Sequence, residues 1–426
     1  MAPKILVLGV GAFAQSIMRI MRRQHAEVFC YLTRNYGHYG PSLEGQVWDS
    51  RQHPSPIPVI QQIKPDLIIP MSIDWHTSAW SEELLAQNIP IFCPKGTAIQ
   101  LEVDRAFARD LCREYGVPFP SSYRVQNRIE ALSLMKKDPK PYVIKNPLCS
   151  PFSPVHTVVC ESIDDTLGWL DRIDYAEGVF LQEYLGTAEA GHFVFVSDGE
   201  IFSIATNQEY KRAFNQNMGP VAGAPMGGLV EQDPQDKYGL AKELIMPLQP
   251  WLKANHFYGP LQVTAIRYQE KWHAIEYNVR LGVTSGALFL SMLENSLEVV
   301  LDIMRGTPPK FHWNAQKPFG CSLSLAGYGY PYVVPQAPSL PVTVSGSPDP
   351  DCDIWWNEVE QVKGQLHMRD HKVAEMGHRI ADVNVCGSDL QEVIQKTYAN
   401  IRKIRCLASY YRTDVGQSLW PPGTGY

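Results

Sequence analysis

The stretch IEYNVRLGVTSG, from Ile275 to Gly286, reads as a β-strand that ends in a glycine-rich segment. Because successive side chains of a strand point to opposite faces, Glu276, Asn278 and Arg280 share one face, and apolar residues occupy the other. Carboxylate and amide oxygens suit Mg²⁺, and a neighbouring guanidinium can bind a phosphate or a carboxylate. A solvent-exposed strand face also alternates in this way, but the apolar strands nearby and the glycine-rich exit favour a functional site.

The segments around this strand predict two sheets. The strand belongs to a larger sheet, in which the polar YQEK at 268–271 reads as a hairpin turn. Residues 121–185, upstream of it, read as a smaller α+β unit. An amphipathic helix is expected after the strand and should end at Gly306. The predicted elements are strands at 141–147, 155–162, 178–185, 192–199, 200–207 and 259–282, and helices at 163–173 and 285–306.

The first hundred residues alternate apolar strands with helical stretches, which predicts a parallel sheet covered by helices. A capped helix is expected from Glu102 to Tyr115. Residues 328–352 are rich in Pro, Gly and Ser and predict a loop or an edge strand, and a last helix should begin at a Ser388 cap. The predicted N-terminal elements are strands at 4–11, 66–72 and 89–94, and helices at 12–24 and 78–87.

Composition limits the class of protein. The chain has 426 residues, of which 45% are hydrophobic and 19% are charged, and this suits a soluble protein of two to four domains. A formal net charge of -6 without a basic block argues against nucleic acid as the main partner. No apolar run is long enough to cross a bilayer, and the N-terminus lacks a signal-peptide cleavage pattern. The 9 cysteines are scattered, so we expect a cytoplasmic protein with reduced thiols.

Three segments carry further candidate binding residues, and each has a plain structural alternative. Lys145 lies on an apolar strand, where it either meets an anion or extends its charge to the surface. Residues 182–185 end a strand where the smaller unit meets the larger one, and either hold an adenine and a ribose or form a connector. Lys211 and Arg212 begin a long glycine- and proline-rich loop that either binds a phosphate or carboxylate or is solvated.

Two other motifs carry less information. GVGAFA, from Gly9 to Ala14, resembles a dinucleotide-binding fingerprint, but it also suits a turn needed for strand–helix packing. No acidic residue ends the second strand to hold a ribose, which favours the packing alternative. His367 and His371 would share one face of a helix, but without a third ligand they do not predict a metal site.

Taken in order along nearly the whole chain, these segments resemble the phosphoribosylamine–glycine ligase family of ATP-grasp enzymes. The matching motifs are AIQLEVDRAFARDLCREYGVPFP (98–120), PYVIK (141–145), LQEYL (181–185) followed by Glu189, QEYKRAFNQNMGPVAGAPMGG (208–228), IEYNVRLG (275–282), SLAGYGYP (324–331), GHRIADV (377–383) and YYRTDVG (410–416).

The resemblance implies a protein of α/β and α+β class with an ATP-grasp fold. It implies ATP and Mg²⁺ as cofactors, a small-molecule amine and a carboxylate as substrates, a monomer or homodimer, and no nucleic-acid or membrane partner. The expected parts are a Rossmann-like N-terminal domain (1–100), a connecting helix (101–120), a small lid (121–187), a larger antiparallel-sheet domain (188–318) and a C-terminal α+β lobe (319–426).

The resemblance also implies roles for single residues. Glu276 and Asn278 would bind Mg²⁺, and Arg105 and Lys145 would contact phosphate. The adenine and ribose pocket would be lined by Gln182, Glu183, Leu185 and Glu189, and the amine or carboxylate substrate would face Lys211, Arg212 and Arg280. The family reaction activates a carboxylate as an acyl phosphate, which an amine attacks to give an amide, ADP and phosphate. The default substrates are phosphoribosylamine and glycine, which give glycinamide ribonucleotide in purine biosynthesis.

The sequence departs from the family pattern near the chemistry. The family's N-terminal G-G-R-E-H-A is replaced by Gly11 to Ser16, and the flap after PYVIK contains no glycine. The G-D-P-E after the metal strand becomes Gly282 to Ser285, and Arg105 replaces a lysine. These departures leave open a sister ATP-grasp ligase with another amine or acid, or a nucleotide-binding protein without turnover.

Overall fold

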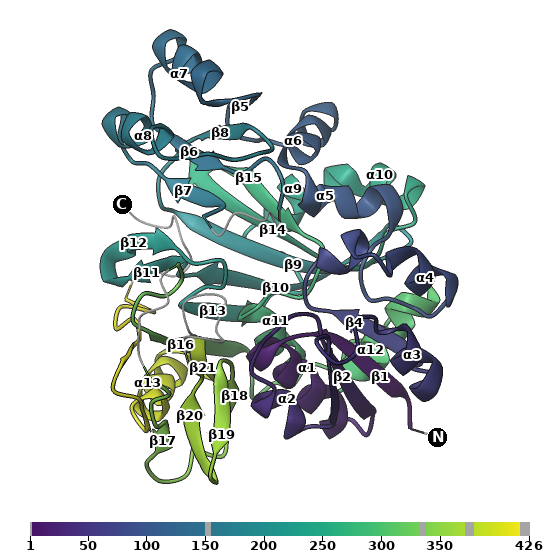
Figure 1. Ribbon diagram of the computed structural model, residues 1–426. Coiled ribbons are helices and arrows are strands. Elements are labelled where there is room, and N and C mark those ends of the chain that lie inside the picture. The colour runs from purple at the N-terminus through teal and green to yellow at the C-terminus, as the bar shows by residue number, and fades with distance from the viewer. Residues whose placement is uncertain (1, 150–154, 333–337, 371–378, 418–426) are drawn as a thin grey trace.

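The computed structural model describes residues 2–149, 155–332, 338–370 and 379–417. Its N-terminal part is the predicted parallel sheet, in the order β3-β2-β1-β4, with α1 at the point where β1 ends (Figure 1). The predicted strand at 89–94 is reduced to a single bridge between Ile68 and Ile91, because prolines at 90 and 94 cannot donate ladder hydrogen bonds. The elements are β1 (Lys4–Gly9), α1 (Gly11–Arg23), β2 (Glu27–Leu32), α2 (Tyr39–Ser42), β3 (Gln46–Asp49), α3 (Ile57–Ile63), β4 (Leu67–Pro70) and α4 (Ser81–Ala86).

The predicted helix from Glu102 to Tyr115 is broken into α5 (Gln100–Val103) and α6 (Arg105–Glu114). Asp104 lies between them in an extended conformation, and its side chain accepts hydrogen bonds from the first free backbone amides of α6. An aspartate that caps the next helix cannot also continue the preceding one. The break places Glu102 and Arg105 on different short helices.

A four-stranded sheet in the order β5-β8-β6-β7 projects from one end of the molecule (Figure 1). Two helices pack on it and share with it a separate core that includes Tyr142, Ile144 and Leu181. The strands and the helix predicted between residues 141 and 185 are confirmed. The elements are β5 (Ser122–Val125), α7 (Arg128–Lys137), β6 (Tyr142–Lys145), β7 (Thr157–Val159), α8 (Ile163–Leu170) and β8 (Val179–Glu183).

The larger sheet is antiparallel and runs in the order β15-β14-β9-β10-β13-β16-β21-β18. The predicted YQEK turn is confirmed, since Gln269 and Glu270 have φ angles of 49° and 64° between β14 and β15. The predicted helix at 285–306 is interrupted where Leu293 bridges to Trp313. The elements are β9 (Glu189–Ser197), β10 (Glu200–Glu209), β11 (Arg212–Phe214), β12 (Met218–Val221), β13 (Gly227–Gln232), α9 (Leu240–Leu244), α10 (Gln249–Ala254), β14 (Tyr258–Tyr268), β15 (Lys271–Asn278), α11 (Ser285–Ser291) and α12 (Ser296–Arg305).

The C-terminal strands extend this same sheet, because β16 pairs with β13 along five residues of each strand. The last helix begins one residue later than predicted and is capped by the Asp389 side chain. His367 lies on strand β20, so the prediction that it lies on a helix is wrong, and His371 lies outside the described residues. The elements are β16 (Phe319–Gly327), β17 (Thr343–Val344), β18 (Cys352–Trp356), β19 (Val359–Val362), β20 (Gln365–Met368), β21 (Arg379–Gly387), α13 (Leu390–Ile401), β22 (Ile404–Arg405) and β23 (Ser409–Tyr410).

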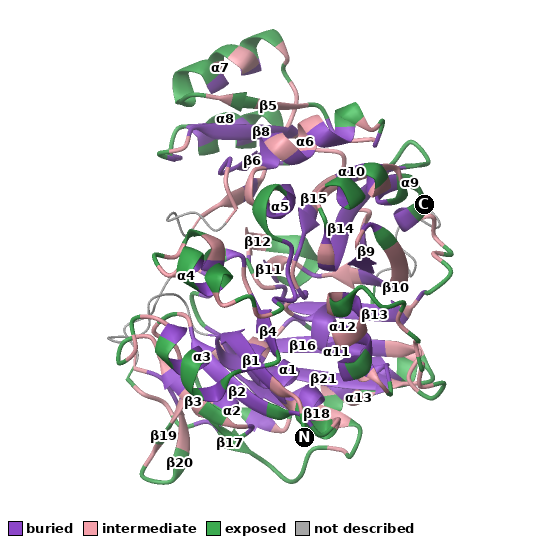
Figure 2. Cartoon of the chain, turned by 90° about the vertical axis from the view of Figure 1, so that its right-hand side faces the viewer, coloured by how far each residue is buried: buried purple, intermediate pink, exposed green. Residues whose placement is uncertain are grey.

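The N-terminal sheet and the larger sheet share a buried core, seen as the purple interior in Figure 2. Phe92, next to the bridge at Ile91, contacts Phe195 of β9 edge to face at 5.4 Å between ring centroids. Phe195 in turn contacts Phe289 of α11. The N-terminal sheet and the larger sheet are therefore packed on one core, while the small sheet has its own. Among the described residues, we find no helix with the length and apolar character needed to span a membrane.

Candidate active site

A cleft lies between the small sheet and the end of the larger sheet and opens to solvent, and the empty space in it, including its open side, is about 1080 Å³. Ligand pockets often lie at such junctions. Its walls come from β6, β7 and β8 on one side and from β9, β15 and the loop after β10 on the other. The predicted residues that line it are Lys145, Gln182, Glu183, Leu185, Glu189, Lys211, Arg212 and Glu276.

Lys145 is the last residue of β6 and lines the cleft with 4% of its surface exposed. Its ammonium donates a hydrogen bond to the backbone carbonyl of Ile275 at 3.2 Å. Burial lowers the pKa of Lys145 to about 7, and nearby Arg105 acts in the same direction. A buried lysine with a lowered pKa is stabilised in its charged form by an anion. The burial of Lys145 therefore supports contact with an anion such as phosphate rather than extension of its charge to the surface.

Glu276 lies on β15 opposite Thr264 of β14, at the edge of the larger sheet. Burial alone would raise the pKa of its carboxyl, but Lys211, Arg105 and Lys145 hold that pKa well below its usual value. Its carboxylate is therefore charged throughout the physiological range and attracts cations from three separate elements.

Asn278 and Arg280 continue from Glu276 as a hydrogen-bonded row. Asn278 Nδ2 donates to Glu276 Oε1 at 3.2 Å, and Arg280 Nη2 donates to Asn278 Oδ1 at 3.0 Å. Arg105 approaches the same carboxylate, with 3.9 Å between its Nη1 and Glu276 Oε2. Glu276 lines the cleft and connects it to three residues that do not line it, namely Asn278, Arg280 and Arg105.

Lys211 and Arg212 are adjacent in sequence but have different partners. Lys211 Nζ lies 2.9 Å from Glu189 Oε1 and 3.8 Å from Glu209 Oε2. Burial alone would lower the pKa of Lys211, but these carboxylates and Glu276 raise it. Arg212 donates to the carbonyl of Gly219 within its own loop and pairs with Glu161 of the small sheet's side at 3.2 Å. Arg212 thus connects the loop to the small unit, whereas Lys211 belongs to the group around Glu276.

Residues 182–185 end β8 where the chain leaves the small sheet. Gln182 Nε2 lies 3.5 Å from the carbonyl of Ile275, the same carbonyl that Lys145 contacts. Glu183 accepts a hydrogen bond from Lys140 at 3.3 Å, and Leu185 contributes an apolar wall. Val143, Val159 and Ile266 add further apolar surface on the same cleft. Apolar surface beside polar groups suits an adenine ring.

The sequence reading missed two residues that the structure brings to the site. His156 follows the flap and lines the cleft, and its burial lowers the pKa of its imidazole to about 4. Glu102 holds Arg280 from α5, with 3.3 Å between Oε1 and Nε. Glu102 lies in one of the motifs that resemble the family (98–120), so the sequence did contain a signal for it. Its contact with β15 depends on the fold. Residues 150–154 of the flap lie outside the described residues.

The turn at GVGAFA is occupied by protein groups. The backbone amide of Ala12 donates to Asn357 Oδ1 at 3.0 Å, and a Cβ added to Gly11 would lie 2.7 Å from that oxygen. Asn357 is buried and also donates to Asp382 at 3.0 Å. The glycine therefore serves close packing between α1 and the C-terminal strands, as in the packing alternative for this motif.

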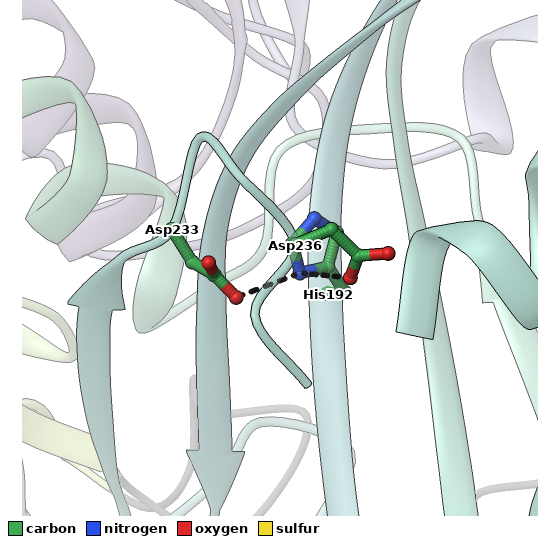
Figure 3. Close-up of side chains that lie close together, drawn as sticks. All are labelled: His192, Asp233 and Asp236. Carbon is green, nitrogen blue, oxygen red and sulfur yellow. Dashed lines mark ion pairs between the residues drawn. The ribbon is translucent and has the colours of Figure 1, made fainter. Parts of the chain in front are cut away.

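A second buried group of titratable residues is His192 on β9 with Asp233 and Asp236, which follow β13 (Figure 3). The Nδ1 atom lies 3.8 Å from an oxygen of each carboxylate. Thr206 lies 2.8 Å from that nitrogen and donates to Asp233 at 2.7 Å. Asp236 accepts hydrogen bonds from backbone amides at the start of α9. These carboxylates thus already stabilise the turn before α9 and cap that helix.

The residues around the cleft fit a magnesium–triphosphate group. Glu276 offers a carboxylate and Asn278 an amide oxygen, the kinds of ligand that Mg²⁺ prefers, although here the Asn278 amide nitrogen faces Glu276 and its oxygen accepts from Arg280. Lys145, Lys211 and Arg105 surround that carboxylate with positive charge. Lys145 has only a backbone carbonyl as its hydrogen-bond acceptor among the described residues, so it retains donors for a phosphate.

Comparison with known proteins gives a consistent result. Residues 103–284 match the family described as the phosphoribosylglycinamide synthetase ATP-grasp (A) domain. The chain is 24% identical to phosphoribosylamine–glycine ligase of Lactococcus lactis, over 79% of this chain and 80% of that protein. The enzyme of the same name from Caulobacter vibrioides is also 24% identical, over 84% and 85%.

Solved structures show the same likeness at the level of the fold. The crystal structure of phosphoribosylamine–glycine ligase from Thermotoga maritima superposes with a TM-score of 0.75 at 20% identity, covering 96% of this chain and 99% of that one. N5-carboxyaminoimidazole ribonucleotide synthetase from Thermus thermophilus gives a TM-score of 0.63 at 12% identity, covering 94% and 98%. The predicted fold and the predicted resemblance are both confirmed by these matches.

Proposed function

This chain is an ATP-grasp ligase, and we propose that its cleft uses magnesium-bound ATP to join a small carboxylate to a small amine, with glycine and phosphoribosylamine as the first pair to test. Enzymes of this class use ATP with Mg²⁺ in general. The observation that carries the proposal is the arrangement around Glu276, whose carboxylate lies beside Asn278 and attracts Lys145, Lys211 and Arg105. These groups are the ones needed to hold a metal and neutralise a triphosphate.

In this proposal, Glu276 and Asn278 hold Mg²⁺, and Lys145 and Arg105 contact the phosphates. The slot formed by Gln182, Glu183, Leu185 and Glu189 receives the adenosine part. Support comes from the lining of the cleft, which combines apolar residues from both sheets with the cations Lys145, Lys211 and Arg212. Lys211 connects the residues proposed for adenosine with those proposed for the metal, because it pairs with Glu189 at 2.9 Å and also acts on Glu276.

The bound nucleotide supplies a phosphoryl group that converts the carboxylate into an acyl phosphate, which the amine attacks with release of phosphate. This chemistry requires positioning and charge neutralisation, and it requires no protein nucleophile. Arg280 has its guanidinium held by Asn278, Glu102 and the Leu281 carbonyl, so it is suited to hold the carboxylate that receives the phosphoryl group.

A second candidate is a sister ligase that keeps ATP and takes a different amine or acid. It is favoured by the turn at Gly11, where the helix N-terminus is satisfied by Asn357 within the protein. The start of a helix that follows a glycine turn is a common place to bind a phosphate, and here the Ala12 amide already has a partner. An amine substrate without a phosphate group would not need a phosphate-binding site at the start of this helix.

The test is ADP formation with ATP, Mg²⁺, glycine and freshly prepared phosphoribosylamine, with each component omitted in turn. ADP that appears only in the complete mixture supports glycine and phosphoribosylamine. ADP that appears only with other acids or amines from a panel supports the sister ligase. If no mixture releases ADP and ATP does not raise the melting temperature, the ligase proposal fails and the chain is a protein without nucleotide turnover.

A further inference from the structure

Glu102 is a buried carboxylate in the connecting segment, on α5, and only 3% of its side chain is exposed. Its Oε2 accepts a hydrogen bond from the backbone amide of Val279 at 2.6 Å. Its Oε1 lies 3.3 Å from Arg280 Nε. A buried carboxylate is costly unless it is paired, and both oxygens of Glu102 are directed at consecutive residues that follow Asn278.

Arg280 is held on three sides. In addition to the ion pair with Glu102, its Nη2 donates to Asn278 Oδ1 and its Nη1 donates to the carbonyl of Leu281 at 3.3 Å. A guanidinium has five N–H donors in a fixed plane, so among the described contacts each terminal nitrogen retains one N–H for another acceptor. Glu102 holds the Nε atom and thereby sets the plane of the Arg280 guanidinium.

We propose that Glu102 is a positioning residue, which orients the Arg280 guanidinium for the reacting carboxylate and fixes the end of β15 through the Val279 amide. This inference rests on the proposed function, since it assigns Glu102 a purpose in that same reaction. Both oxygens of the buried Glu102 are already paired with Arg280 and the Val279 amide, so it acts through Arg280 rather than on the substrate. The contact also ties the connecting segment to the strand that carries Glu276 and Asn278.

The variant Glu102→Gln separates the two contacts. A glutamine can still accept the Val279 N–H, but it lacks the charge that pairs with Arg280. We expect kcat to fall by about tenfold to a hundredfold, as small misplacements of a reacting group do, while the Kd of magnesium–nucleotide changes by less than about threefold. An unchanged kcat would overturn the inference.

Glu358→Gln is a matched control, because Glu358 and Arg369 form another buried ion pair, at 2.7 Å, away from the cleft. This variant is expected to lower the melting temperature without lowering kcat. A fall in kcat in both variants to the same extent would show that loss of a buried pair, rather than the position of Arg280, causes the effect.

A double-mutant cycle tests the route of the effect. In an Arg280→Gln background, Glu102→Gln should cause no further loss of kcat, because the group that it orients is gone. If the two losses instead multiply, Glu102 acts independently of Arg280 and the inference is wrong.

A readout without turnover distinguishes failure of this inference from failure of the proposed function. In ¹⁵N-arginine-labelled protein, the Nε–H resonance of Arg280 is identified by its absence from Arg280→Lys. It should be sharp in the parent and shifted or broadened in Glu102→Gln but not in Glu358→Gln. An unchanged resonance overturns the inference even if the enzyme turns over. A changed resonance in a chain without ADP formation shows that Glu102 orients Arg280, while the ligase proposal fails and the role of this contact in that reaction fails with it.

Discussion

The Lys145 ammonium donates to the backbone carbonyl of Ile275 at 3.2 Å, across the cleft from β6 of the small sheet to β15 of the larger one. Gln182 approaches the same carbonyl at 3.5 Å. Ile275 directly precedes Glu276, so the small sheet is anchored to the strand that carries the proposed metal ligands. The proposed phosphate-binding lysine and the proposed metal-binding carboxylate are therefore positioned by one backbone segment.

Binding of nucleotide is expected to be coupled to uptake of a proton by Lys145. Burial lowers the pKa of this amine to about 7, so at pH 8 it is largely neutral in the free protein. A triphosphate beside it favours the charged form and raises the pKa, so most of one proton should be taken up at pH 8 and little at pH 6. Calorimetry in buffers with different ionisation enthalpies measures this uptake.

Lys145→Arg is the control for that measurement. Arginine keeps the positive charge and does not titrate in this range, so its proton uptake at pH 8 should be close to zero. Equal uptake in the parent and in Lys145→Arg would show that another group takes the proton.

His192 is expected to weaken the protein in acid. Burial lowers the pKa of its imidazole, against the opposite effect of Asp236 and Asp233. A base with a lowered pKa in the folded state binds more protons when unfolded, so the free energy of unfolding falls as the pH drops below the ordinary value of about 6.5. Between pH 7 and pH 5.5, the parent should therefore lose more of its free energy of unfolding than His192→Asn does in urea titrations. His256→Asn, at an exposed position, should keep the parent's slope.

Asn357 is expected to stabilise the contact between the N-terminal and C-terminal parts of the chain. Its amide accepts from Ala12 and donates to Asp382, and both contacts are buried. Asn357→Ala leaves the Ala12 amide without its acceptor and removes one donor from Asp382, which keeps its bonds from Arg379 and Ser324. The free energy of unfolding should fall by about 1–3 kcal/mol, while nucleotide affinity stays the same. A tenfold loss of nucleotide affinity, without loss of stability, would show that the turn at Gly11 takes part in binding.

Much of the fold follows from local patterns that the sequence contains. The alternation in 275–282 and the YQEK turn are local, so β14, β15 and their hairpin are predictable. The break at Asp104 was missed because its side chain caps α6 in competition with continuation of α5. The pairing of β13 with β16 joins segments about ninety residues apart, and no local pattern specifies it.

In the candidate site, too, local features are predictable from the sequence and long-range contacts are not. The types of residue at the cleft are predictable, because Lys145 and Glu276 are charged groups on apolar strands. Their partners depend on which loops meet after folding, and so the pairing of Arg212 with Glu161 and of Glu102 with Arg280 is not visible in the sequence. Asn357 at the turn of Gly11 is a contact across more than three hundred residues.

The role of Glu276 as a metal ligand is tested by calorimetric titration with a non-hydrolysable ATP analogue, with and without Mg²⁺. In the parent, Mg²⁺ should strengthen binding by about tenfold or more, whereas Glu276→Gln should lose most of this gain and Glu358→Gln should keep it. If Glu276→Gln binds the magnesium–nucleotide as tightly as the parent does, the metal does not lie on β15 and the proposed site is wrong.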